Sequence, residues 1–75
     1  DTDPVKRLLH VFREKPEQGI ATLMAALGLS HRPTFRRNYL NPALAQGYVE
    51  RTIPDKPNSP AQKYRLTEKG RQLIR

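Results

Sequence analysis

Leu27-Gly-Leu-Ser-His-Arg-Pro-Thr-Phe-Arg-Arg-Asn-Tyr39 is the stretch of the chain that decides the fold. Gly28 predicts the left-handed end of one helix, and Ser30 predicts the N-cap of the next. Two helices joined by so short a turn are typical of a helix-turn-helix. The second helix then begins with Arg32, Arg36 and Arg37 available to a partner, and a phosphate backbone fits such a cationic face.

Two helices are expected before this turn. An apolar stripe from Val5 to Phe12, with spacings of three and four residues, predicts a helix over about residues 4–15 that is capped by Asp3. The same spacing recurs over residues 20–27 and predicts a short second helix.

A third helix is expected over about residues 31–46, and Pro42 lies inside it. Proline cannot donate a backbone hydrogen bond, and its ring crowds the carbonyl one turn earlier. On an uninterrupted helix, Phe35 and Tyr39 would point about 100 degrees away from Leu40 and Leu44. We therefore expect a bend or break near Pro42 that brings both pairs of side chains onto one core.

The second half of the chain predicts a hairpin and a last helix. Residues 48–53 and 63–66 are rich in aromatic and β-branched residues or alternate polar with apolar, as strands do. Prolines and turn formers fill the loop from Pro54 to Pro60, which has the length of a wing. Thr67 is the expected cap of a helix over about residues 67–75, and Gly70 within it indicates close packing.

These elements predict a mainly α fold with a small β-hairpin, namely a winged helix-turn-helix with a three-helix core, a two-stranded wing and a C-terminal helix. We expect one domain over residues 1–75. Because the chain starts at Asp1 directly in a helix cap, we expect it to be excised from the C-terminus of a larger protein.

Composition narrows the function classes. The formal charge of +7 suggests nucleic acid or an acidic surface as partner, although a solvated basic surface gives the same number. There is no cysteine, and His10 and His31 are too few for an all-protein zinc site. Ser30 and His31 lack an acid to orient the imidazole, so they form no catalytic pair. We expect no enzyme activity, metal or cofactor in this chain, no membrane partner, and a cytoplasmic location.

The third helix and the wing supply the candidate contacts. Arginine bonds guanine bidentately and asparagine bonds adenine, so the face opposite the apolar side has the chemistry of a major-groove reader. The candidate nucleic-acid-binding residues are Arg32, Thr34, Arg36, Arg37, Asn38, Asn41, Lys56, Lys63 and Arg65, with Arg51 as a further strand cation. A stiff, proline-bearing wing equally suits a contact with protein.

The run from Leu27 to Leu44, followed by Gly47-Tyr-Val-Glu and by the segment from Ile53 to Thr67, resembles a bacterial C-terminal winged-helix module. This module ends RecG-like, ATP-dependent DNA helicase-related proteins, and a similar one ends some Fic-family proteins. The wing Pro-Asp-Lys-Pro-Asn-Ser with Lys-Tyr-Arg-Leu-Thr is the most specific part, and the resemblance covers about residues 20–70. It implies a parent that carries an ATP-binding-type, Schlafen-like or Fic nucleotide-transfer region, none of whose catalytic motifs occurs here.

Two functions follow as expectations. In the first, the module binds double-stranded DNA, with the third helix in the major groove and the wing on neighbouring phosphates. In the second, it is an interaction or regulatory module that docks on its parent's catalytic domain or mediates self-association.

Overall fold

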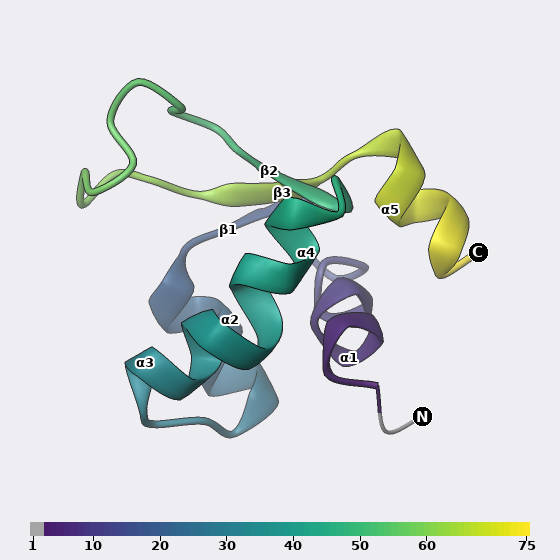
Figure 1. The fold of residues 1–75 in the computed structure, drawn as a ribbon, viewed down its shortest axis with the longest axis horizontal. Coiled ribbons are helices and arrows are strands. Elements are labelled where there is room, and N and C mark those ends of the chain that lie inside the picture. The colour runs from purple at the N-terminus through teal and green to yellow at the C-terminus, as the bar shows by residue number, and fades with distance from the viewer. Residues whose placement is uncertain (1–2) are drawn as a thin grey trace.

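The computed structural model describes residues 3–75, so the first two residues of the predicted domain lie outside the described part. The elements are α1 (Pro4–Val11), β1 (Glu17–Gln18), α2 (Ile20–Leu27), α3 (Arg32–Phe35), the π-helical segment η1 (Arg36–Leu40), α4 (Asn41–Ala45), β2 (Val49–Arg51), β3 (Tyr64–Leu66) and α5 (Glu68–Leu73). Helices lie against one side of a small sheet, and the loop between β2 and β3 extends beyond it (Figure 1). The predicted mainly helical fold with a small sheet is confirmed, and it is compatible with a winged helix.

Helix α1 is shorter than the sequence predicts, because it ends at Val11 and not near residue 15. Asp3 does cap it, since its carboxylate accepts a hydrogen bond of 2.9 Å from the Val5 amide. After Val11 the chain turns, and the side-chain amide of Gln18 donates to the carbonyls of Val11 and Lys15 at 2.9 and 3.1 Å. The buried glutamine thus satisfies carbonyls of the turn that follows the helix.

The turn between α2 and α3 follows the sequence except at its cap. Gly28 adopts the left-handed conformation with φ of 73°, and the Leu29 amide donates to the Met24 carbonyl at 2.9 Å. The expectation that Ser30 caps the third helix is wrong, because the N-cap residue is His31. The His31 Nδ1 atom lies 2.6 Å from the Thr34 hydroxyl, and no side chain caps the backbone amides of this first turn.

The third helix accommodates Pro42 through a π turn and not through a break. The Asn41 amide donates to the carbonyl of Arg36, five residues earlier, which is the bond of a π-helix. The extra residue in the π turn changes the direction in which the side chains after it point from the helix axis. Phe35 and Leu40 are therefore both buried, at 0% and 2% exposure, although a regular α-helix would separate them.

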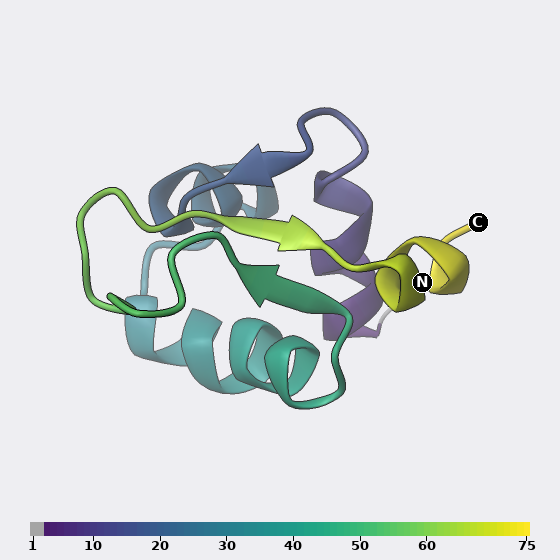
Figure 2. The ribbon, with the colours of Figure 1, turned by 90° about the horizontal axis from the view of Figure 1, so that it is seen from above.

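The sheet has three antiparallel strands in the order β1-β3-β2, so the expected two-stranded hairpin is incomplete (Figure 2). Gln18 of β1 pairs with Tyr64, and Arg51 of β2 pairs with Tyr64 from the other side. Strand β1 is only Glu17 and Gln18, and two polar residues after a proline carry no strand signal in the sequence.

One hydrophobic core joins the helices to the sheet. Its fully buried side chains come from α1, α2 and the third helix, and the strands and the C-terminus close it. The core residues are Leu8, Leu9, Phe12, Leu23, Met24, Phe35, Tyr39, Leu40, Ala43, Val49, Tyr64 and Ile74.

Gly70 sits where α5 meets the chain before β2. A Cβ at this position would lie 2.1 Å from the Tyr48 carbonyl oxygen, which already accepts from the Thr67 amide at 3.0 Å. We expect Gly70→Ala to lower the free energy of unfolding by about 1–3 kcal/mol, because backbone must move to admit the methyl group. Urea denaturation measures this change. The exposed Gln72→Ala in the same helix serves as control, and an equal effect of both variants would contradict the packing argument.

Candidate nucleic-acid interface

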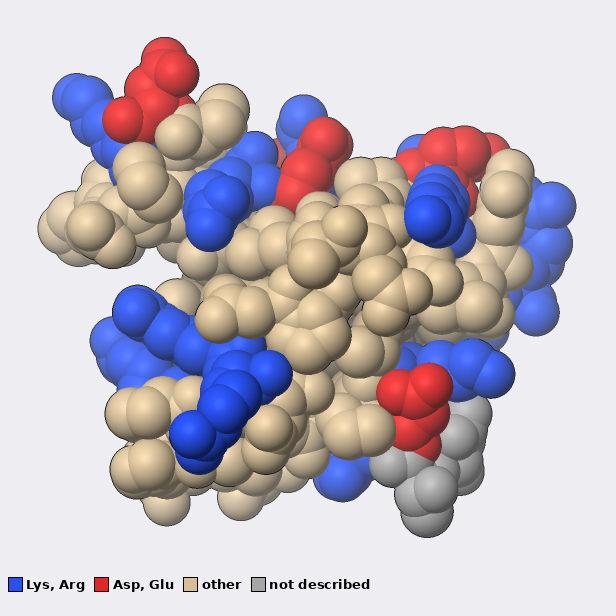
Figure 3. Space-filling model, viewed as in Figure 1, with Lys and Arg blue, Asp and Glu red and all other residues tan. Residues whose placement is uncertain are grey.

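The third helix carries unbalanced positive charge. Residues 18–49 contain no Asp or Glu, while Arg32, Arg36 and Arg37 are exposed at its start. Elsewhere in the described chain, Arg65 forms an ion pair with Glu50 at 2.7 Å and Arg71 forms one with Glu68 at 3.0 Å. Neither ion pair involves the third helix. Positively charged side chains gather over α3 and η1 beside a hollow below the wing (Figure 3), and those of these two elements are arginines. This surface is thus suited to an anionic partner.

The predicted reading face is only partly free. Arg37, Asn38 and Asn41 are exposed and make no side-chain contact with acids in the described chain. Thr34 differs, because its side chain is half-buried and its hydroxyl is held by His31. Three of the four residues expected on this face are therefore exposed, although Asn41 also lines a small recess beside Arg36. The fourth, Thr34, belongs to the start of the helix.

The wing is an ordered loop, because Gln62 holds it from inside. Gln62 is 8% exposed, and its Oε1 atom accepts from the Ile53 amide at 2.9 Å. Its Nε2 atom donates to the carbonyls of Ile53 and Lys56, at 2.5 and 3.0 Å. The loop also turns back through the Ser59 amide, which donates to the Lys56 carbonyl at 3.0 Å. One buried amide side chain thus ties both ends of the wing together.

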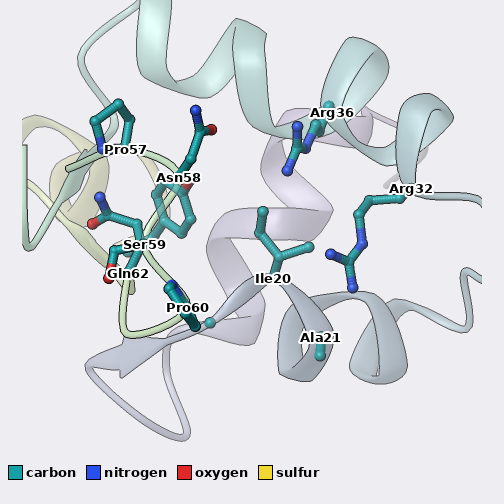
Figure 4. A pocket seen from close by; sticks show the side chains of 11 residues that line it. Ile20, Ala21, Arg32, Arg36, Pro57, Asn58, Ser59, Pro60 and Gln62 are labelled. Atoms are coloured by element: carbon teal, nitrogen blue, oxygen red, sulfur yellow. The ribbon is translucent and has the colours of Figure 1, made fainter.

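A cleft of about 370 Å³ separates the wing from the helices. Arg32 and Arg36 enter it from the third helix, residues 19–21 at the start of α2 form another wall, and wing residues 57–60 lie opposite (Figure 4). A smaller recess of about 80 Å³ extends along Arg36, Asn41 and Arg51 and shares Tyr64 with the cleft. Two arginines one turn apart therefore face the wing across an open space.

The strand cations are divided between the two faces of the sheet. Arg51 pairs with Tyr64 in the register, so it lies on the cleft side. Arg65 is one residue further and points to the opposite side, where it pairs with Glu50. Lys63 is exposed two residues before Arg65, and Lys56 is exposed in the wing. The structure brings Arg51 to the third helix, and it keeps Arg65 away from it.

One residue that lines the cleft, Tyr64, is not among the candidate residues predicted from the sequence. Its side chain is 4% exposed. It also lines the cleft and the recess, together with Asn58 of the wing. The alternation of the strand predicts a buried ring, but the ring lines a cleft only because the wing folds back beside it.

Residues 3–75 contain no cluster of three acidic or histidine side chains that could hold a metal ion. None of the helices in this part of the chain has the length and apolar character to cross a membrane.

The comparisons with known proteins agree with this architecture. A family model described as "Filamentation induced by cAMP protein Fic-like, C-terminal domain" matches residues 3–67. The chain belongs to this family. A crystal structure of a Fic family protein from Desulfovibrio desulfuricans G20 is similar, with 56% sequence identity and a TM-score of 0.83. The match covers 93% of this chain and 21% of that one, so the chain spans about a fifth of the matched protein. No curated protein matches.

For this Fic-like C-terminal domain, the resemblance to the module of Fic-family proteins is confirmed. Neither description refers to a helicase, so the RecG-like relation stays a prediction. The matched region is a C-terminal domain of this family, and the absence of enzyme activity in these residues stays a prediction.

Gln62 offers a direct test of the wing. We expect Gln62→Ala to lower the free energy of unfolding by about 1–3 kcal/mol, because buried backbone groups of the wing lose their partner. Amide hydrogen exchange should become faster at Ile53, whose N–H loses its acceptor, with little change in α1 and α2. Gln46→Ala removes an exposed glutamine side chain and serves as control. Unchanged exchange at Ile53 would show that Gln62 does not hold the wing.

Proposed function

We propose that this Fic-like C-terminal domain binds duplex DNA on behalf of a larger Fic-family parent. The observation that supports the proposal is the acid-free third helix, with Arg32, Arg36 and Arg37 exposed and without acidic partners in the described chain. Such a surface is costly to keep without an anionic partner, because like charges on neighbouring turns repel each other. A phosphate backbone offers charges at regular spacing to neutralise them.

Each part of the surface has a role in this proposal. The exposed face with Arg37, Asn38 and Asn41 enters the major groove, where arginine and asparagine can bond guanine and adenine edges. Lys56 on the wing and Arg51 on β2 contact phosphates beside the groove. Lys63 and Arg65 belong to the outer face of the sheet, so we leave them outside the proposed contact surface.

A groove on another side of the domain favours a second candidate function. It has a volume of about 170 Å³ and is lined by Phe12, Pro16, Glu17, Arg65, Leu66 and Arg71. It shares no lining residue with the cleft below the wing. Its partly apolar lining suits a segment of a parent protein, and the matched Fic family protein is several times longer than this chain. Docking on the parent's catalytic domain is therefore the alternative, or self-association through the same groove.

A salt titration tests DNA binding. If about five cations contact phosphates, the logarithm of the affinity for a random duplex should fall against the logarithm of the salt concentration with a slope of about −4.5. Fluorescence anisotropy with a labelled duplex measures this slope. Absence of binding at low salt would overturn the proposal.

A pair of charge-matched variants locates the contact surface. We expect Arg37→Gln to weaken duplex binding about tenfold, because it removes a contact to a base or a phosphate. Arg75→Gln removes the same charge at the C-terminus, far from the wing (Figure 1), and should change the affinity less than twofold. Equal losses in both variants would indicate attraction by net charge alone. Amide shifts that occur only with the parent's catalytic domain, and not with duplex, would favour docking.

A further inference from the structure

Within residues 3–75, the Tyr64 hydroxyl has no hydrogen-bond partner. The side chain is 4% exposed, so the strand position buries the ring almost completely. Tyr39 differs, because its hydroxyl accepts a hydrogen bond from Arg7 at 3.5 Å. Among the described residues, no buried polar side-chain atom is both enclosed and unpaired, so the Tyr64 oxygen must reach open space. Tyr64 lines the cleft below the wing and the smaller recess that adjoins it. Buried tyrosines usually bond their hydroxyl, so the Tyr64 hydroxyl is free to bond a water molecule or a ligand in that space.

Helix α2 presents further donors to the same cleft. Its N-cap is Gly19, and no side chain caps the first turn. The amides at the start of an α-helix point away from it and have no partner within it. Gly19, Ile20 and Ala21 line the cleft, so these donors lie beside the space that Tyr64 reaches. The positive end of the helix dipole adds to their preference for an anion.

Arg32 and Arg36 decide the charge of the ligand. Both side chains project into the cleft from the third helix, opposite the wing (Figure 4). The cleft of about 370 Å³ falls at the small end of the range of ligand sites. No acidic residue lines it. We propose that the cleft binds a phosphate group, with Arg32 and Arg36 supplying charge and the Tyr64 hydroxyl and the α2 amides supplying hydrogen bonds.

The phosphate has two sources, a DNA backbone or a small phosphorylated ligand. If the phosphate belongs to a DNA backbone, this inference rests on the proposed function and deepens it. In a helix-turn-helix the first helix crosses the backbone while the second enters the groove. The start of α2 would then hold one phosphate of the strand that passes between the wing and the third helix. Arg36 would contact this phosphate, and Arg37, the next residue, would contact the major groove.

The test uses Tyr64→Phe, which removes the hydroxyl alone. Because that hydroxyl bonds nothing in the protein, the fold should be unchanged. Tyr48→Phe makes the same chemical change outside the cleft and serves as control. The 75-residue chain is titrated with inorganic phosphate, and separately with a random duplex, while amide shifts are recorded at constant ionic strength. We expect shifts at residues 20–22 with both probes, and binding about tenfold weaker in Tyr64→Phe.

Each outcome decides a different point. Loss of duplex affinity in Tyr64→Phe and Arg36→Gln, with Tyr48→Phe unchanged, supports a backbone phosphate in the cleft. Phosphate binding that depends on Tyr64, without any duplex binding, supports a small-ligand site and overturns the proposed DNA binding. Duplex binding that both cleft variants leave intact, with no phosphate shifts at residues 20–22, overturns the phosphate site and leaves DNA binding standing.

Discussion

The π turn in the third helix is the constraint on which the surface of the domain depends. Pro42 has no N–H, so a regular helix would leave one carbonyl of the preceding turn without a donor and crowd it with the ring. The bond from the Asn41 amide to the Arg36 carbonyl widens the turn by one residue instead. Phe35 and Leu40 then share one core. The π turn connects Arg36, which lines the cleft, to Asn41, which lines the recess beside it. Arg37 and Asn38 are exposed within the turn and line neither space.

The wing completes this division because it is held in place from within. Gln62 bonds the backbone of Ile53 and Lys56, which fixes the loop against the end of the sheet. A loop held in this way loses little conformational freedom when it meets a partner, so more of the contact energy remains as affinity. The sheet separates charge as well. Arg51 and Tyr64 face the third helix, while Arg65 is neutralised by Glu50 on the other side.

Local rules predicted the parts of this fold whose cause lies within a few residues. Gly28, Asp3 and Thr67 occupy the turn and cap positions that their chemistry requires, and Gly70 meets the close approach that its place in a helix indicated. Features that depend on contacts between residues far apart in the chain could not be predicted from the sequence. Strand β1 forms because Gln18 pairs with Tyr64, more than forty residues later in the chain, and the residue types of Glu17 and Gln18 do not predict a strand. Likewise, the ion pair of Arg65 with Glu50 depends on the register of β2 and β3, which the sequence does not reveal.

The two proposed roles use different faces of the domain, and charge explains why they need not compete. The cleft and the third helix carry arginines without acids, whereas the groove beside α5 combines Phe12 and Leu66 with the opposite charges of Glu17 and Arg71. The first surface suits a uniformly anionic partner, and the second suits a mixed protein surface. A parent that docks through the groove would leave the cleft and the third helix exposed. The domain could then bind an anion while it is docked on the parent. The parent's catalytic region would in that case be held at a fixed distance from the anion.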